Sequence, residues 1–229
     1  MSDADDGHSR RQRLVLPIED FHQITQFFLR WEGRLEQLSR GRFHGQLQVV
    51  QGSLVRIASI TGNQQIVLQG SDLVPNYSFN PIVPGNTKST WRGHQFPPGH
   101  MVVLSPHAPT DFCSGRHTDH TSAWIDVETF EKAARELLGQ DELPKISAWA
   151  VKLVRPNLFA LITQQFHKIL SMGINDPSSL DTHEGYRLEQ ECVRTVIEAM
   201  IPFPVVDTPL PGPDSPGSPG DRFYAWSFG

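Results

Sequence analysis

Apolar residues near the N-terminus recur at alternating steps of three and four positions. The six residues of this stripe are Phe21, Ile24, Phe28, Trp31, Leu35 and Leu38. This spacing places all six on one face of a helix, with polar residues on the other. Gly41 is suited to end such a helix. The pattern therefore predicts an amphipathic helix that begins near Glu19 and ends before Gly41.

From Phe43 to Val127 the period changes towards two, and turn residues interrupt it often. The segments with this pattern read FHGQLQVV, SLVRIASI, QQIVLQG, NYSFN, HMVVLS and TSAWIDV. The turn sequences between them are TGN at 61–63, PGN at 84–86 and PPG at 97–99. Several short strands separated by such turns favour an antiparallel sandwich or barrel over a parallel sheet. We expect a small antiparallel β-barrel or jelly roll of the cupin-like kind.

Helical patterns return after the predicted strands. VETFEKAARELL, at 127–138, is acidic early and is followed by Gly139, whereas ISAWAVKLV reads as extended. A second helix is predicted from Pro156, which suits a first turn, and a third over Leu188–Met200. Two apolar stripes run along these last helices: Phe159, Ile162, Phe166 and Ile169 on one, and Val193, Val196, Ile197 and Met200 on the other.

These patterns divide the chain into four parts and give the fold class α+β. Residues 1–18 form a polar head that we expect to be disordered. Residues 19–140 hold the first helix and the barrel, and 141–200 hold the helices that pack or dimerise. The tail, 201–229, carries seven of the 18 prolines and reads as an extended linker.

Composition narrows the classes of function. The formal charge is −5, from 20 basic and 25 acidic residues, so the chain lacks the basic excess typical of DNA-binding proteins. No apolar run approaches the ~18 residues of a membrane span. The N-terminus lacks the apolar core of a secretory signal, so we expect a cytoplasmic protein. Cys113 and Cys192 form no CxxC pair, which predicts reduced thiols rather than a thiolate zinc site.

Two stretches of the sequence resemble a known family. QLSRGRFHGQLQVV begins the strand-rich region, and TWRGHQFPPGHMVVLSPHAPTDF carries a W-x-G…G…L-x-P pattern. Both resemble the ligand-sensing domain of AraC-type transcription regulators, and the order of helix, barrel and helices agrees. The resemblance covers about residues 19–200.

The resemblance implies a small-molecule effector and dimerisation through the helices attached to the sensor. Regulators of this family continue into two helix-turn-helix units, but a Pro-rich tail stands in that place here. The sequence therefore reads as a sensor without its DNA-binding half. We expect a homodimer, or a heterodimer with an intact relative, and no DNA binding by this chain alone.

Aromatic and basic residues in the predicted strands are the candidates for ligand binding. Tyr77 and Phe79 are two positions apart and share a face, and Trp91 and Trp124 lie in or beside other strands. An ordinary core explains the first pair equally well, and Trp91 would serve a turn just as well. Arg56, in the middle of a predicted strand, would bind an anionic ligand group if buried, or would face water on an edge strand.

Histidines raise the alternative of a metal-dependent barrel enzyme. The residues are His94, His100, His107, His117 and His120. Metal cupins usually carry H-x-H followed by Glu, but this chain has only H-x-x-H at 117–120 and no Glu between Glu36 and Glu128. No nucleophile or nucleotide-binding motif occurs. We therefore expect a non-enzyme without cofactor, and keep as alternatives a cupin-type enzyme, with or without a His-bound metal, and a structural module whose barrel is filled by side chains.

The stripe Phe159, Ile162, Phe166 and Ile169 has two interpretations. It packs onto the barrel, or it forms the seam of a two-fold dimer. Because one small barrel offers limited surface to cover two stripes, we predict that this stripe is the dimer interface.

Overall fold

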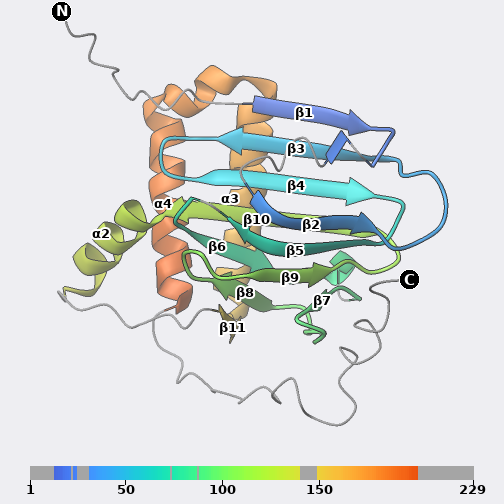
Figure 1. Cartoon of the computed structure of the whole chain (residues 1–229). Coiled ribbons are helices and arrows are strands. Elements are labelled where there is room, and N and C mark those ends of the chain that lie inside the picture. Colours follow the sequence, from blue (N-terminus) through green and yellow to red (C-terminus); the bar gives the residue numbers. More distant parts are fainter. Residues whose placement is uncertain are drawn as a thin grey trace, which may run out of the picture.

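Two antiparallel sheets lie face to face, and helices cover the outer face of the larger sheet (Figure 1). The computed structural model describes residues 13–21, 23–24, 31–72, 74–86, 88–139 and 149–200. The seven-stranded sheet has the order β1 (Arg13–Ile18), β3 (Gly45–Gln51), β4 (Arg56–Gly62), β10 (Thr118–Asp126), β6 (Asn76–Pro81), β8 (His100–Leu104) and β11 (Trp149–Leu153). The four-stranded sheet has the order β2 (Trp31–Gln37), β5 (Ile66–Asp72), β9 (Thr110–Cys113) and β7 (Thr90–Trp91).

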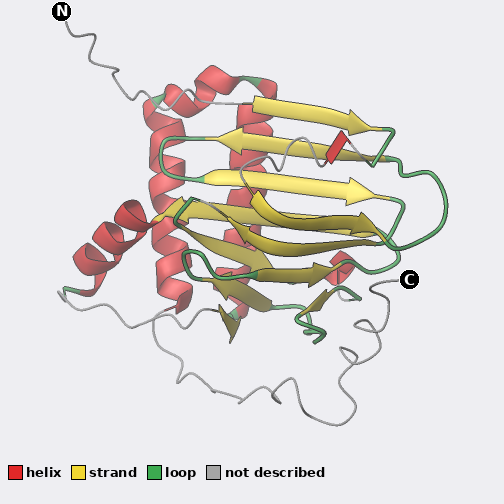
Figure 2. Ribbon diagram, viewed as in Figure 1, coloured by secondary structure: helices red, strands yellow, loops and turns green. Residues whose placement is uncertain are grey.

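The helices follow from local sequence signals. In α2 (Val127–Leu138), the Asp126 side chain accepts a hydrogen bond from Thr129 N at 2.9 Å, and Gly139 ends the helix with a positive φ of 61°. α3 (Pro156–Asn175) begins at a proline, whose fixed φ suits a first turn. A short 3₁₀ segment, Pro177–Asp181, leads into α4 (His183–Met200). Figure 2 shows α3 and α4 behind the sheets, with α2 to the left of them.

The core has two layers because the larger sheet is apolar on both faces. Its outer face packs against α2, α3 and α4 through residues such as Ile57, Phe79 and Ile125. Its inner face meets the smaller sheet through two further clusters, one around Leu47 and Ile66 and one around Trp91, Val102 and Phe112. Successive residues of a strand therefore belong to different layers.

A buried carboxylate fastens α4 to the turn between β3 and β4. Glu189 is fully buried, and its Oε2 accepts hydrogen bonds from Leu54 N at 2.6 Å and Val55 N at 3.1 Å. A Cβ added at Gly52 in that turn would collide with the same carboxylate. Burial, followed by the charge of Glu189, raises the pKa of the Cys192 thiol. The Glu189 carboxylate therefore needs a residue without a side chain at position 52.

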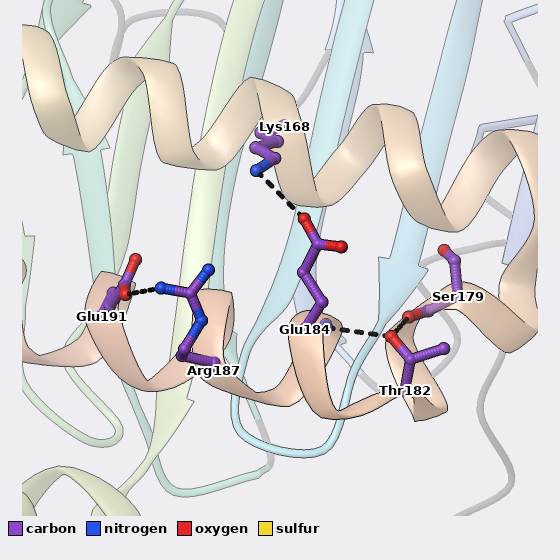
Figure 3. Close-up of polar contacts among 7 residues, drawn as sticks. Lys168, Ser179, Thr182, Glu184, Arg187 and Glu191 are labelled. Carbon is purple, nitrogen blue, oxygen red and sulfur yellow. Dashed lines mark hydrogen bonds and ion pairs between the residues drawn. The ribbon is translucent and has the colours of Figure 1, made fainter.

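Polar side chains on α3, on α4 and on the segment before α4 make contacts with one another (Figure 3). Lys168 on α3 lies 3.7 Å from Glu184 on α4, and Arg187 pairs with Glu191 at 2.8 Å. Thr182 accepts a hydrogen bond from Gly185 N at 3.1 Å at the start of α4. Exposed ion pairs of this kind contribute little stability, so the helices are held mainly by their buried faces.

The predicted small barrel is not found among the described residues, and the cupin-like jelly roll is not confirmed. All strand pairs are antiparallel, as predicted, but the strands form two open sheets that do not close into a barrel. The six predicted strand segments all contain a strand, whereas β7 and β9 were not predicted. The helices predicted at 127–138, from Pro156 and over Leu188–Met200 are confirmed. The extended ISAWAVKLV segment is confirmed over Trp149–Leu153, and its positions 146–148 lie outside the described residues.

The predicted N-terminal helix is wrong over its second half. Trp31–Gln37 is strand β2, which pairs with β5. Trp31 and Leu35 are four positions apart, a spacing that places two residues on one face of either a helix or a strand. The backbone pairing of this segment with β5 selects the strand over the helix. The Phe28 position lies outside the described residues.

The boundary of the predicted polar head is also wrong. Arg13–Ile18 forms β1, the edge strand that pairs with β3. Leu14 and Leu16 pack on the inner core, and Ile18 is buried there. The expectations for residues 1–12 and for the tail 201–229 lie outside the described residues.

Candidate functional site

Tyr77 and Phe79 share a face of β6, but α2 covers that face. Their rings lie 4.5 Å and 5.6 Å from the ring of Phe130 on α2. Phe79 is completely buried, and burial, followed by the charge of Glu131, raises the pKa of Tyr77. The two residues therefore belong to the core between sheet and helices, which is the ordinary interpretation of their pattern.

Arg56 and Trp124 meet on the opposite, inner face of the large sheet. They are cross-strand partners on β4 and β10, and the Arg56 guanidinium carbon lies 5.2 Å from the centre of the Trp124 ring. Both side chains are partly buried. A guanidinium over an indole face is a favourable cation–π arrangement. The structure thus brings together two of the five residues predicted to bind ligand.

A network of buried polar side chains continues from this pair across the inner face. Ser78 is the cross-strand partner of Trp124. Asn80 Nδ2 donates to Ser78 Oγ at 3.1 Å and to Val102 O at 3.2 Å. Ser122 Oγ donates to Asn80 Oδ1 at 2.6 Å and lies 2.7 Å from His120 Nε2. Burial of four polar side chains in a sandwich interior is costly unless they bind one another or a ligand.

The direction of these hydrogen bonds fixes the tautomer of His120. Both Asn80 N–H groups are used, so its oxygen is the acceptor for the single hydroxyl proton of Ser122. Ser122 must then accept a proton from His120 Nε2. Burial lowers the pKa of His120 to about 4, so the ring is neutral and its Nδ1 carries a lone pair. That Nδ1 is buried and has no hydrogen-bond partner.

Trp91 from the smaller sheet presents a second buried and unpaired nitrogen to the same interior. Its indole Nε1 has no hydrogen-bond partner, and its side chain is 3% exposed. The ring centroids of Trp91 and His120 are 5.6 Å apart. Phe112 is the cross-strand partner of Trp91, and its ring stacks on that of His120 with 4.6 Å between the centroids. The interior therefore offers one acceptor and one donor that nothing in the described chain satisfies.

The neutral His120 makes stability depend on pH. Unfolded histidine binds a proton near pH 6.5, whereas buried His120 does so only near pH 4. Stability is therefore greatest above pH 6.5 and falls as the pH drops towards 4, because the unfolded chain takes up the proton first. The difference of pKa corresponds to about 3 kcal/mol.

We expect His120→Gln to lose less unfolding free energy than the unmutated protein between pH 7 and about pH 4.5. Urea unfolding at the two pH values measures this difference. His117→Gln, at an exposed position nearby, is the matched control. Equal pH slopes for the unmutated protein and His120→Gln would show that His120 is not buried as a neutral ring.

The other histidines do not converge on one point. His107 and His117 are exposed, and His100 Nδ1 lies 3.0 Å from the carbonyl oxygen of Pro97. The two histidines of the H-x-x-H pair separate, because His117 is exposed and His120 is buried. Within the described part of the chain, no group of three or more His, Cys, Asp or Glu side chains could hold a metal ion.

The residues predicted to form the dimer seam lie in the core. Ile162 and Ile169 are fully buried and Phe166 is 1% exposed, all against the outer face of the large sheet, and Phe159 is partly buried beside them. The second stripe, around Val193 and Val196, is buried in the same cluster. We expected one small barrel to be unable to cover both stripes, but the outer face of the seven-stranded sheet is wide enough to cover them.

Ser78, Asn80 and Ser122 were not among the predicted site residues. A signal for Ser78 and Asn80 was present in NYSFN, where polar and apolar positions alternate, whereas TSAWIDV does not alternate and gave none for Ser122. If Tyr77 and Phe79 face the core, then Ser78 and Asn80 must face the other side. The sequence does not say whether that side meets water or a second sheet.

Of the comparisons with known proteins, the one with solved structures finds a similar fold. No protein-family model matches the sequence, and no curated protein matches it. Among solved structures, the chain is similar to the AraC-like transcriptional activator CuxR, with a TM-score of 0.56 and 14% identity over 84% of this chain and 71% of that chain. Among the described residues, no helix is both long and apolar enough to cross a membrane. The family resemblance seen in the sequence thus has a counterpart in the structure: the chain shares the fold of an AraC-like transcriptional activator.

Proposed function

We propose that this chain is the small-molecule sensing domain of an AraC-like transcription regulator and has no catalytic role. The observation that carries the proposal is the pair of unsatisfied nitrogens, His120 Nδ1 and Trp91 Nε1, buried between the two sheets. A ligand group that donates to the first and accepts from the second would satisfy both. A hydroxyl group does this with one atom.

The chemistry around these nitrogens narrows the effector class. The network from His120 to Ser78 is uncharged, because its imidazole is neutral and its other members are hydroxyl and amide groups. The aromatic rings of Trp91 and Phe112 add flat apolar surface. We infer a small neutral effector that carries a hydroxyl group, with Arg56 and Trp124 at the other end of the same face.

Thermal unfolding in the presence of small compounds tests this proposal. The panel consists of polyols and monosaccharides, with small carboxylates as the contrasting class. We expect at least one hydroxylated compound to raise the unfolding temperature of the unmutated protein, because binding to the folded state stabilises it. Ser122→Ala should abolish that shift, since it breaks the chain that orients His120.

Ser171→Ala, at an exposed position on α3, is the matched control and should keep the shift. The proposal fails if no compound of either class stabilises the protein, or if the Ser122→Ala and Ser171→Ala variants respond alike. If only carboxylates stabilise the protein, Arg56 is the recognition residue instead of His120 and Trp91.

Dimerisation is the second part of the proposal. With both apolar stripes buried, the outward faces of α3 and α4 are left for a contact with a second copy or with an intact relative. Their surface carries charges of both signs, such as Lys168 and Glu184, so a two-fold contact there would pair opposite charges and weaken with salt. The proposal places the chain in the cytoplasm and assigns it no DNA binding of its own.

A further inference from the structure

A small cavity lies on the other side of the large sheet, away from the proposed effector site. It has a volume of about 130 Å³ and is bounded by the start of β10, the end of β6 and α3. Asp119 and Thr121 line it from β10, and Thr163 and His167 line it from α3. The apolar part of its wall comes from Pro81, Val83 and Phe166.

The donor hydrogens of the polar groups on this wall are already used elsewhere. The Thr163 hydroxyl donates to the carbonyl oxygens of Phe159 at 3.0 Å and Ala160 at 2.9 Å. The Thr121 hydroxyl donates to Ser59 Oγ at 3.1 Å. Each hydroxyl oxygen keeps only acceptor capacity towards the cavity.

The side chain of His167 also directs its one ring hydrogen away from the cavity. Its Nδ1 lies 2.7 Å from the carbonyl oxygen of Thr163, which only accepts, so Nδ1 carries the hydrogen. In the neutral ring, Nε2 then carries a lone pair and can only accept a hydrogen bond. Asp119 adds an acceptor with a negative charge. The polar wall of the cavity is therefore made of acceptors and has one carboxylate.

We propose that this cavity binds a small primary alkylammonium ion. An ammonium group brings three donor hydrogens and a positive charge, which match the acceptors and the carboxylate. A short alkyl chain would rest on Pro81 and Val83. The volume is well below the roughly 300 to 1,000 Å³ of sites for larger ligands, so the ion has only a few carbons.

Titration of the full chain with n-butylammonium chloride, followed by two-dimensional amide NMR, tests the proposal. We expect saturable shifts centred on Thr121, Thr163 and His167. Asp119→Asn should weaken the affinity by roughly 10- to 100-fold, because it removes the charged acceptor. Glu136→Gln removes the same charge from an exposed position on α2 and should leave the affinity unchanged.

Two further probes separate the ammonium hydrogens from charge and apolar contact. Tetramethylammonium has the charge without N–H donors, and 1-butanol has the chain without the charge; neither should bind comparably. The proposal is overturned if tetramethylammonium binds as well as butylammonium, if Asp119→Asn and Glu136→Gln behave alike, or if the shifts centre on His120 and Ser122. Absence of saturable shifts in a folded protein would overturn it as well.

Discussion

Phe166→Glu is expected to unfold the protein at room temperature. The Phe166 side chain is 1% exposed and packs with Ile162 and Ile169 between α3 and the large sheet. Truncation of a buried phenylalanine costs about 3 to 5 kcal/mol, and an unpaired carboxylate in the same place costs more. Typical domains have about 5 to 15 kcal/mol of total stability, so little would remain. Circular dichroism during thermal unfolding measures the effect.

Leu161→Glu is the matched control for this prediction. Leu161 lies on the same helix and is 40% exposed, so the same change should leave a cooperative unfolding transition close to that of the unmutated protein. The oligomeric state is measured separately, by light scattering of the unmutated protein and of this variant at low and high salt. If Phe166→Glu were instead a folded monomer while the unmutated protein is a dimer, the stripe would be a dimer seam after all.

Loss of the contact between Glu189 and the β3–β4 turn is the second change that we expect to lower the unfolding free energy strongly. Glu189→Ala leaves the backbone N–H groups of Leu54 and Val55 without their acceptor and is expected to cost about 3 kcal/mol of unfolding free energy. Gly52→Ala is also expected to be strongly destabilising, because the new methyl group collides with the Glu189 carboxylate. Urea unfolding of each variant measures both costs.

The double variant tests whether the two effects share one contact. With Glu189 truncated to alanine, the methyl group at position 52 no longer meets a carboxylate, so the combined cost should be clearly smaller than the sum of the single costs. Glu191→Ala removes an exposed ion pair with Arg187 and should change stability by no more than about 0.5 kcal/mol. Additive costs for Gly52→Ala and Glu189→Ala would show that the turn does not rest on Glu189.

Local chemistry in the sequence was sufficient for much of the secondary structure. The helix at 127–138 has an aspartate cap before it and a glycine after it, and its predicted bounds match those of α2. The strand segments carried both the period of two and the turn residues between them, so antiparallel pairing could be predicted. These features depend on residues a few positions apart, which the linear sequence contains.

Tertiary structure decided what the local pattern left open. Trp31 and Leu35 fit a helix or a strand equally well, and only the pairing of β2 with β5 selects the strand. The alternation in NYSFN separates Tyr77 and Phe79 from Ser78 and Asn80, yet only the packing of α2 shows which side is plain core. The stripe around Phe166 could be core or interface until the width of the large sheet was known.

The candidate site itself divides in the same way. Local pattern was sufficient to place Arg56 and Trp124 in strands. The contact of His120 with Ser122 was not predicted, and the structure alone shows it. Only the tertiary structure placed Trp91 from the smaller sheet beside His120 from the larger one. Contacts between residues distant in sequence depend on sheet order and on which faces meet, and neither is written in the period of any single segment.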